Sequence, residues 1–204
     1  MWPGGFNNRS GNAVSMRTRP GVQPEARPSA PPSGVRAVFL VGFMGAGKNS
    51  VGRALSRRLG WPFEDLDERI QAREGRTIEQ IFRQSGEAEF RCAEHAALRE
   101  LLSDLGSSPR VVALGGGAFV QANNAALLGE TGVLTIFLDA PVEELFQRCQ
   151  QEQMERPLRG DLQQFRQLYE TRRPCYMTAA LRIETGGKDV EAVAAEVIGR
   201  LGLR

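Results

Sequence analysis

Four residues in the segment VFLVGFMGAGKNS (38–50) have the types and spacing needed to bind phosphate: Gly42, Gly45, Gly47 and Lys48. Glycines allow backbone N–H groups to wrap closely around phosphate oxygens. The lysine would reach the β- and γ-phosphates, and the start of the following helix would add free N–H groups and its dipole. The pattern predicts a nucleoside triphosphate site formed by Gly42, Met44, Gly45, Ala46, Gly47, Lys48, Asn49 and Ser50.

Asn49 occupies the position at which such loops usually carry a serine or threonine that binds Mg²⁺. Its side-chain carbonyl is also a neutral oxygen, but lies one bond further from the backbone. We expect this oxygen to ligate the metal directly after a small shift, or to hold a metal-bound water. Ser50 is a poor substitute, because the next residue of a helix points about 100° away.

Alternating strand-like and helix-like segments must position this loop. Short apolar runs rich in β-branched residues predict buried parallel strands, and the amphipathic segments between them predict helices. The alternation predicts an α/β fold with three layers, in which helices cover both faces of a parallel sheet. The expected strands are 36–41, 61–67, 110–117 with its glycine turn, 132–140 and 181–185; the expected helices are 49–60, 77–86, 87–106, 141–150 and 189–202.

The composition of the 204-residue chain indicates one domain, 35–204, after a disordered N-terminal extension, 1–34, that is rich in Pro, Gly, Ser and Arg. The five arginines and one glutamate of residues 1–36 leave the remainder nearly neutral, so nucleic-acid binding is not expected. The chain has no apolar run long enough to span a membrane. Three widely spaced cysteines indicate reduced thiols in a cytoplasmic protein: Cys92, Cys149 and Cys175.

Five further motifs follow the loop in order: DLD (65–67), GEAEFRCAE (86–94), GGG (115–117), RPL (156–158) and RRPCY (172–176). Together they closely resemble the shikimate kinases, and the resemblance extends over essentially the whole expected domain. It implies the fold of the nucleoside monophosphate kinases. That is a three-layer P-loop kinase fold with a five-stranded parallel sheet, a helical substrate-binding region and a mobile lid, which the polar stretch QQEQMERPLRGD would form here.

The resemblance also implies roles for two acidic residues and a turn. Asp65 resembles the carboxylate that holds Mg²⁺ through water. Asp67 resembles the carboxylate that hydrogen-bonds the substrate hydroxyls and orients the nucleophile. The three glycines of the third motif resemble a turn that lets backbone approach the sugar-like ring: Gly115, Gly116 and Gly117.

Basic residues complete the implied site. Arg91 and Arg172 resemble two arginines that clamp the shikimate carboxylate, and Glu94 resembles a residue that steadies them. Arg156 resembles the lid arginine that swings onto the transferring phosphate, and Arg148 a residue that stacks on adenine. The catalytic residues implied by the resemblance are Lys48, Asp67 and Arg156.

The activity implied is ATP-dependent phosphorylation of the shikimate 3-hydroxyl, a step towards chorismate and the aromatic amino acids. ATP and shikimate would be the partners, Mg²⁺ the cofactor, and the protein a monomer. A gluconate kinase is an alternative, because gluconate is also a polyhydroxy acid. A second alternative is a non-catalytic nucleotide-binding relative. Asn49 favours that alternative, and the retained Lys48, Asp65 and Asp67 oppose it.

Overall fold

The computed structural model describes residues 35–106, 108–151 and 161–203. The N-terminal extension predicted over 1–34 lies outside these residues, as do most of the predicted lid and Arg156. No helix in the described part of the chain combines the length and apolar character needed to cross a bilayer.

The predicted five-stranded parallel sheet is confirmed, with the strand order β2-β3-β1-β4-β5. Every pair of neighbouring strands is parallel. Each connection must therefore cross back over the sheet, and each contains at least one helix. The strands are β1 (Ala37–Val41), β2 (Phe63–Asp65), β3 (Arg110–Ala113), β4 (Leu134–Asp139) and β5 (Leu181–Glu184).

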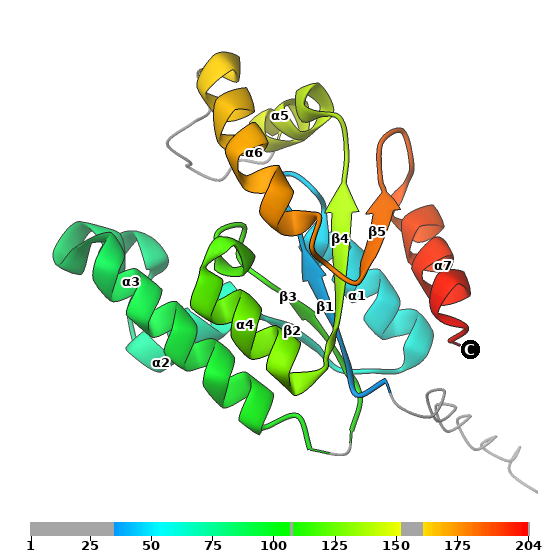
Figure 1. Cartoon of the computed structure of the whole chain (residues 1–204), viewed down its shortest axis with the longest axis horizontal. Coiled ribbons are helices and arrows are strands. Elements are labelled where there is room, and N and C mark those ends of the chain that lie inside the picture. Colours follow the sequence, from blue (N-terminus) through cyan, green and yellow to red (C-terminus); the bar gives the residue numbers. More distant parts are fainter. Residues whose placement is uncertain (1–34, 107, 152–160, 204) are drawn as a thin grey trace, which may run out of the picture.

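The helices form a layer on each side of this sheet (Figure 1). Helices α1 and α7 lie side by side on one face, and α3 and α4 lie on the other, while α5 and α6 stand above the carboxyl ends of the strands. The helices are α1 (Lys48–Leu59), α2 (Leu66–Glu74), α3 (Ile78–Ser103), the 3-10 helix η1 (Ala118–Val120), α4 (Ala122–Thr131), α5 (Val142–Gln151), α6 (Leu162–Tyr176) and α7 (Val190–Leu201).

The central strand β1 lies in the middle of the hydrophobic core. All five of its residues are at most 1% exposed, because helices cover both faces of the sheet. Burying a large apolar side chain of this kind contributes about 1.5–3 kcal/mol. The core thus gives the loop after β1 a rigid base.

Several predicted helix boundaries are confirmed. Thr77 caps α3 in a capping box with Gln80, in which each side chain accepts from the backbone N–H of the other. Gly86 has a φ of 80° and kinks α3 where the sequence predicted two separate helices.

Two predictions need correction. The strand predicted to reach Asp67 ends at Asp65, because the Asp65 carboxylate accepts from the Asp67 backbone N–H and so caps α2. Asp67 therefore lies in the first turn of a helix. Helices α2, α4 and α6 are absent from the expected helices. Neither α2 nor α4 has a strongly apolar stripe, and α6 contains Pro174.

The strand register brings the functional segments to one edge of the sheet. Asp65 pairs with Ala113, and Ala113 pairs with Leu40, so β2, β3 and β1 end at nearly the same level. The loops that follow them lie side by side at the carboxyl edge, where ligands bind in open α/β sheets.

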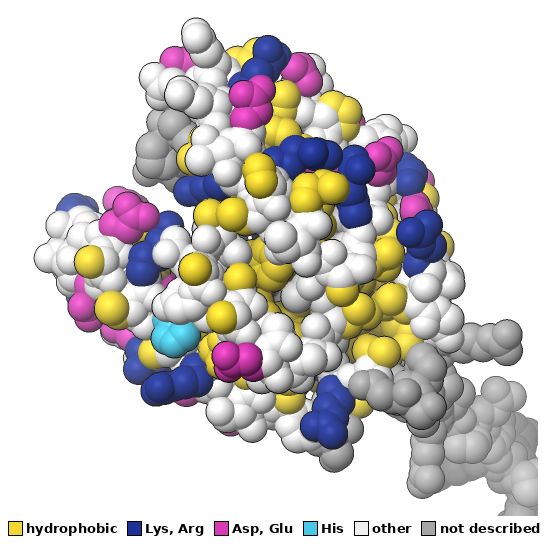
Figure 2. Space-filling view, in the orientation of Figure 1, with side chains coloured by type: hydrophobic (Ala, Val, Ile, Leu, Met, Phe, Trp, Pro, Cys, Tyr) yellow, Lys and Arg dark blue, Asp and Glu magenta, His cyan; other side chains and the backbone are white. Residues whose placement is uncertain are grey.

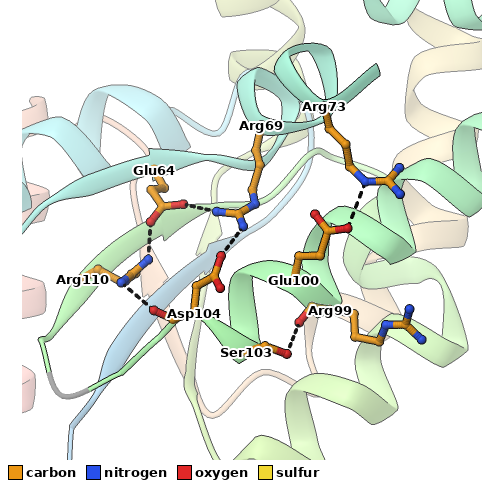
Figure 3. Close-up of polar contacts among 8 residues, drawn as sticks. All are labelled: Glu64, Arg69, Arg73, Arg99, Glu100, Ser103, Asp104 and Arg110. Carbon is orange, nitrogen blue, oxygen red and sulfur yellow. Dashed lines mark hydrogen bonds and ion pairs between the residues drawn. The ribbon is translucent and has the colours of Figure 1, made fainter. Parts of the chain in front are cut away.

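A network of ion pairs joins β2 and α2 to the start of β3 and the end of α3 (Figure 3). Glu64 on β2 accepts from Arg110 on β3 and, at 3.2 Å, from Arg69 on α2. Arg69 also donates to Asp104, just beyond α3, at 2.5 Å. Single exposed ion pairs contribute little, but a partly buried network contributes more. Because Glu64 directly precedes Asp65, this network helps to hold that carboxylate in place.

Candidate active site

The segment between β1 and α1 folds as the predicted phosphate-binding loop. Gly45 has a φ of 77°, and a Cβ there would lie 2.4 Å from the carbonyl oxygen of Leu145. A side chain is therefore excluded for two reasons, backbone strain and collision. Lys48 begins α1, and its Nζ donates to the carbonyl oxygens of Gly42 at 2.9 Å and Phe43 at 3.0 Å. Its ammonium group thus lies over the loop.

Asn49 lies beside Asp65, as a shared metal site requires. The Asn49 Nδ2 donates to Asp65 Oδ2 at 2.5 Å. The other oxygen of Asp65 accepts from the backbone N–H of Asp67 at 2.8 Å. The start of α1 and the start of α2 therefore meet at one carboxylate, which is 8% exposed.

The glycine turn after β3 lies between Asp67 and Arg91. A Cβ added at Gly115 would lie 2.6 Å from Asp67 Oδ1. At Gly117 it would lie 2.8 Å from a guanidinium nitrogen of Arg91. A Cβ at Gly115 or Gly117 would therefore displace the side chain of Asp67 or Arg91. Gly116 lies against the phosphate loop, where its Cβ would be 3.6 Å from the backbone nitrogen of Met44.

Arg91 and Glu94 form a half-buried ion pair on α3. Arg91 Nη1 donates to Glu94 Oε2 at 3.0 Å, one helical turn away, and Glu94 is only 1% exposed. Arg91 Nη2 also donates to the exposed Glu87 at 3.0 Å. Burial raises the pKa of the Glu94 carboxyl, while the charge and hydrogen bond of Arg91 act in the opposite direction.

Arg172 approaches the same place from α6. Its guanidinium lies 5.9 Å from the centre of the Phe43 ring in the phosphate loop, and its charge acts on Glu94. The adjacent Arg173 has a different environment. It donates to the buried Asp139 at 2.8 Å and to the Tyr169 hydroxyl at 3.1 Å. Of the two neighbouring arginines, only Arg172 is thus linked to the Arg91–Glu94 pair.

Tyr176 is a site residue that the sequence reasoning missed. It is fully buried, and its hydroxyl donates to the carbonyl oxygen of Gly116. Burial raises the pKa of this phenol, and the charge of Arg172 opposes that shift, so the donor hydrogen is retained at neutral pH. The signal was available, because Tyr176 is the last residue of the RRPCY motif.

A groove of about 440 Å³ leads away from the phosphate loop. Arg148 on α5 lies along it and donates to the carbonyl oxygens of Thr185 at 2.9 Å and Gly45 at 3.4 Å. The groove wall after β5 was also missed by the sequence reasoning, although it includes residues of the glycine-rich TGGKD turn before α7. The residues of this wall are Thr185, Lys188, Asp189, Val190 and Val193.

The predicted site residues that the structure describes therefore converge on one edge of the sheet. The loop and groove form one half, and Asp67, the glycine turn, Arg91 and Arg172 form the other. Figure 2 shows the surface hollowed between the end of α3 and the end that carries α5 and α6, with Lys or Arg side chains on both sides of the hollow. Such an arrangement of basic and backbone groups is chemically suited to a phosphate-rich ligand beside a small anion.

Known proteins resemble this chain in sequence and in fold. The sequence model of one family, described as Shikimate kinase, matches residues 44–202. The chain belongs to the shikimate kinase family. A shikimate kinase from Persephonella marina is 39% identical over 168 residues, covering 82% of this chain and 99% of the relative. One from Geobacter metallireducens is 43% identical over 173 residues, covering 83% of this chain and 94% of the relative.

Solved structures agree with this membership of the shikimate kinase family. The shikimate kinase from Acinetobacter baumannii, solved in complex with shikimate, has a TM-score of 0.74 at 36% identity, and 82% of this chain matches 93% of that one. The Aquifex aeolicus shikimate kinase has a TM-score of 0.71 at 36% identity, with 81% and 96% covered. A gluconokinase from Sinorhizobium meliloti has a TM-score of 0.52 at 17% identity, which is a likeness of fold alone.

Proposed function

We propose that the protein is a shikimate kinase, which transfers the γ-phosphoryl group of ATP to the 3-hydroxyl of shikimate. The products are shikimate 3-phosphate and ADP. The observation that carries this proposal is the pair of arginines, Arg91 and Arg172, whose charges both act on the buried Glu94, with Arg172 next to Phe43 of the phosphate loop. A relative whose structure contains shikimate has the same fold at 36% identity.

The two arginines bind the substrate carboxylate. A planar guanidinium donates two parallel hydrogen bonds to a carboxylate, so a pair of them selects a small acid. Glu94 holds Arg91 at 3.0 Å and keeps its guanidinium in place before the substrate arrives. Because the Arg91 side chain is already ordered, less conformational entropy is lost when the substrate binds.

Asp67 orients the reacting hydroxyl. Its carboxylate lies against the Gly115 backbone, at the border between the substrate half and the phosphate loop. A carboxylate there accepts the hydroxyl hydrogen and directs the oxygen lone pair at the γ-phosphorus. Phosphoryl transfer needs little covalent help, because positioning and charge neutralisation supply most of the catalysis.

The phosphate loop and groove bind ATP. Loop N–H groups surround the phosphates, and Lys48 turns from its loop carbonyls to the β- and γ-phosphates. The base extends along the groove, where Arg148 stacks on it. Arg156, beyond the described residues, approaches the transferring phosphate from the lid.

The residues present fit Mg²⁺ as the cofactor. Mg²⁺ takes hard oxygen ligands, retains several waters and often needs only one or two protein carboxylates besides phosphates. Asp65 offers such a carboxylate beside Asn49 at the start of α1, where the phosphate loop ends. When bound, the ion would neutralise phosphate charge. We also assign the protein to the cytoplasm, as a monomer.

The alternative substrate, gluconate, has less support. The related gluconokinase shares only the fold, at 17% identity, whereas curated shikimate kinases reach 39–43% over most of the chain. The non-catalytic alternative rests on Asn49 alone.

Measuring ADP release distinguishes the three candidate functions: shikimate kinase, gluconate kinase and non-catalytic nucleotide-binding protein. The protein is incubated with Mg·ATP and either shikimate or gluconate, and ADP is measured by a coupled assay. We expect turnover with shikimate and only background ADP release with gluconate. Turnover with gluconate alone would identify the other kinase, and no acid-dependent turnover at any Mg²⁺ concentration would support the non-catalytic reading.

A further inference from the structure

The orientation of the Asn49 side chain follows from its partner. An ionised carboxylate can only accept hydrogen bonds, so the Asn49 atom 2.5 Å from Asp65 Oδ2 must be the amide nitrogen. The carboxamide oxygen is therefore directed away from that contact. Direct ligation of the metal through the oxygen was one of the two options that the sequence left open. The contact with Asp65 instead makes the Asn49 side chain a hydrogen-bond donor to that carboxylate.

Asp65 is held from two directions. Its Oδ1 accepts from the backbone N–H of Asp67 at 2.8 Å, and its Oδ2 accepts from Asn49. With only 8% of the residue exposed, the carboxylate has little room to rotate. One donor belongs to α1 and the other to α2, so the carboxylate also joins two elements that are far apart in sequence.

We propose that Asn49 is a positioning residue, which acts on Mg²⁺ through Asp65 by donating its amide N–H to that carboxylate. This rests on the proposed Mg·ATP-dependent function. A serine or threonine hydroxyl has a single hydrogen and lies on a short side chain. The longer carboxamide has separate donor and acceptor atoms. It holds the carboxylate with the nitrogen, while the oxygen is directed away from that contact.

Loss of the Asn49–Asp65 contact should change the affinity for Mg²⁺ substantially. Partners that orient a metal-binding carboxylate typically change metal affinity by 10–100-fold when removed. Asn49→Ala removes the donor, and so should weaken Mg²⁺ binding to the enzyme–ADP complex by about 10-fold or more. Asn49→Thr restores a hydroxyl donor and should recover most of that affinity.

A double-mutant cycle separates this role from direct ligation. Asp65→Asn is the second change, because asparagine is as good a helix cap as aspartate and α2 should stay intact. Mg²⁺ is titrated into each enzyme–ADP complex by calorimetry, without turnover. Asn49→Ala should weaken binding in the parent but change it by less than about twofold in the Asp65→Asn background. An equal loss in both backgrounds would overturn the proposal, since a direct ligand acts without Asp65.

The metal-free protein provides a second readout. Asn49→Asp replaces the donor with a second carboxylate next to Asp65, so its unfolding midpoint should fall below those of the parent and Asn49→Ala. Adding Mg²⁺ should recover part of this loss. An Asn49→Asp midpoint equal to that of the parent would overturn the contact itself. If the parent binds ADP without any dependence on Mg²⁺, the proposed metal function fails, whereas the midpoints still report on the contact.

Discussion

The hydroxyl of Tyr176 donates a hydrogen bond to the carbonyl oxygen of Gly116, which lies 60 residues earlier in the chain. Gly116 in turn packs against the phosphate loop near Met44. Tyr176 is one helical turn beyond Arg172 on α6. A single part-buried hydrogen bond thus connects the helix of Arg172, the glycine turn and the nucleotide half of the site.

Replacing Tyr176 with phenylalanine removes only this hydroxyl. The part-buried Gly116 carbonyl loses its donor, so Tyr176→Phe should lower the free energy of unfolding by about 0.5–1.5 kcal/mol. The released turn also carries the contacts with Asp67 and Arg91, and we expect the KM for shikimate to rise more than the KM for ATP. Urea unfolding and steady-state kinetics measure the two effects.

The same helix provides the control. Tyr169 is also buried, and its hydroxyl donates to Asp139 at 2.6 Å, outside the substrate half. Tyr169→Phe should therefore lower stability with little change in the KM for shikimate. If both variants shift that KM equally, the Tyr176–Gly116 bond has no special role in the site.

Alanine substitution should lower substrate turnover at Arg172 but thermal stability at Arg173. Arg172→Ala removes a proposed carboxylate ligand and should cost about 2–5 kcal/mol of transition-state binding, measured as kcat/KM for shikimate. Arg91→Ala should cost a similar amount, and the KM for ATP should hardly change in either variant.

Arg173→Ala is the matched comparison. It leaves the buried Asp139 with one cationic partner fewer, so thermal unfolding should occur at a lower temperature. The kcat/KM for shikimate should stay near that of the parent. If Arg173→Ala instead lowered kcat/KM for shikimate while Arg172→Ala did not, Arg173 would be the carboxylate ligand.

Asp67→Asn tests the residue proposed to orient the nucleophile. The change keeps the shape of the side chain and removes its charge. Turnover should fall by about 100-fold or more, while the KM for ATP stays nearly constant. Unchanged turnover would reduce Asp67 to a substrate-binding role.

Glu94 should give the protein a distinct pH dependence. Burial raises the pKa of its carboxyl above the ordinary value of about 4.3 that it has in the unfolded chain. A carboxyl with a raised pKa contributes stability below its unfolded pKa and loses that contribution as the pH rises through the folded value. The free energy of unfolding of the parent, relative to Glu94→Gln, should therefore decrease as the pH is raised from about 4 towards neutrality.

Urea unfolding at stepped pH values measures this difference. Glu87→Gln serves as the control, because it removes the exposed partner of the same Arg91. A parent that gains stability over Glu94→Gln with rising pH would contradict the assignment and would mean that Arg91 outweighs burial.

Much of this protein is determined locally by its sequence. Glycine spacing and Lys48 predicted the phosphate loop, because φ values near 80° favour a residue without a side chain. Thr77 predicted the start of α3, and Gly86 its interruption, since capping and left-handed turns depend on neighbouring residues. The ordered motifs then singled out Asp67, Arg91 and other positions that the structure brings together.

Only the tertiary structure turned the Asn49 amide to Asp65, joined Tyr176 to Gly116 and tied Arg173 to the buried Asp139. It also added the groove wall after β5. These contacts join residues on separate strands and helices, and they depend on the order of the strands, their register and the direction in which each helix crosses the sheet. Local sequence patterns carry none of that information, because it arises when the elements bury a common core.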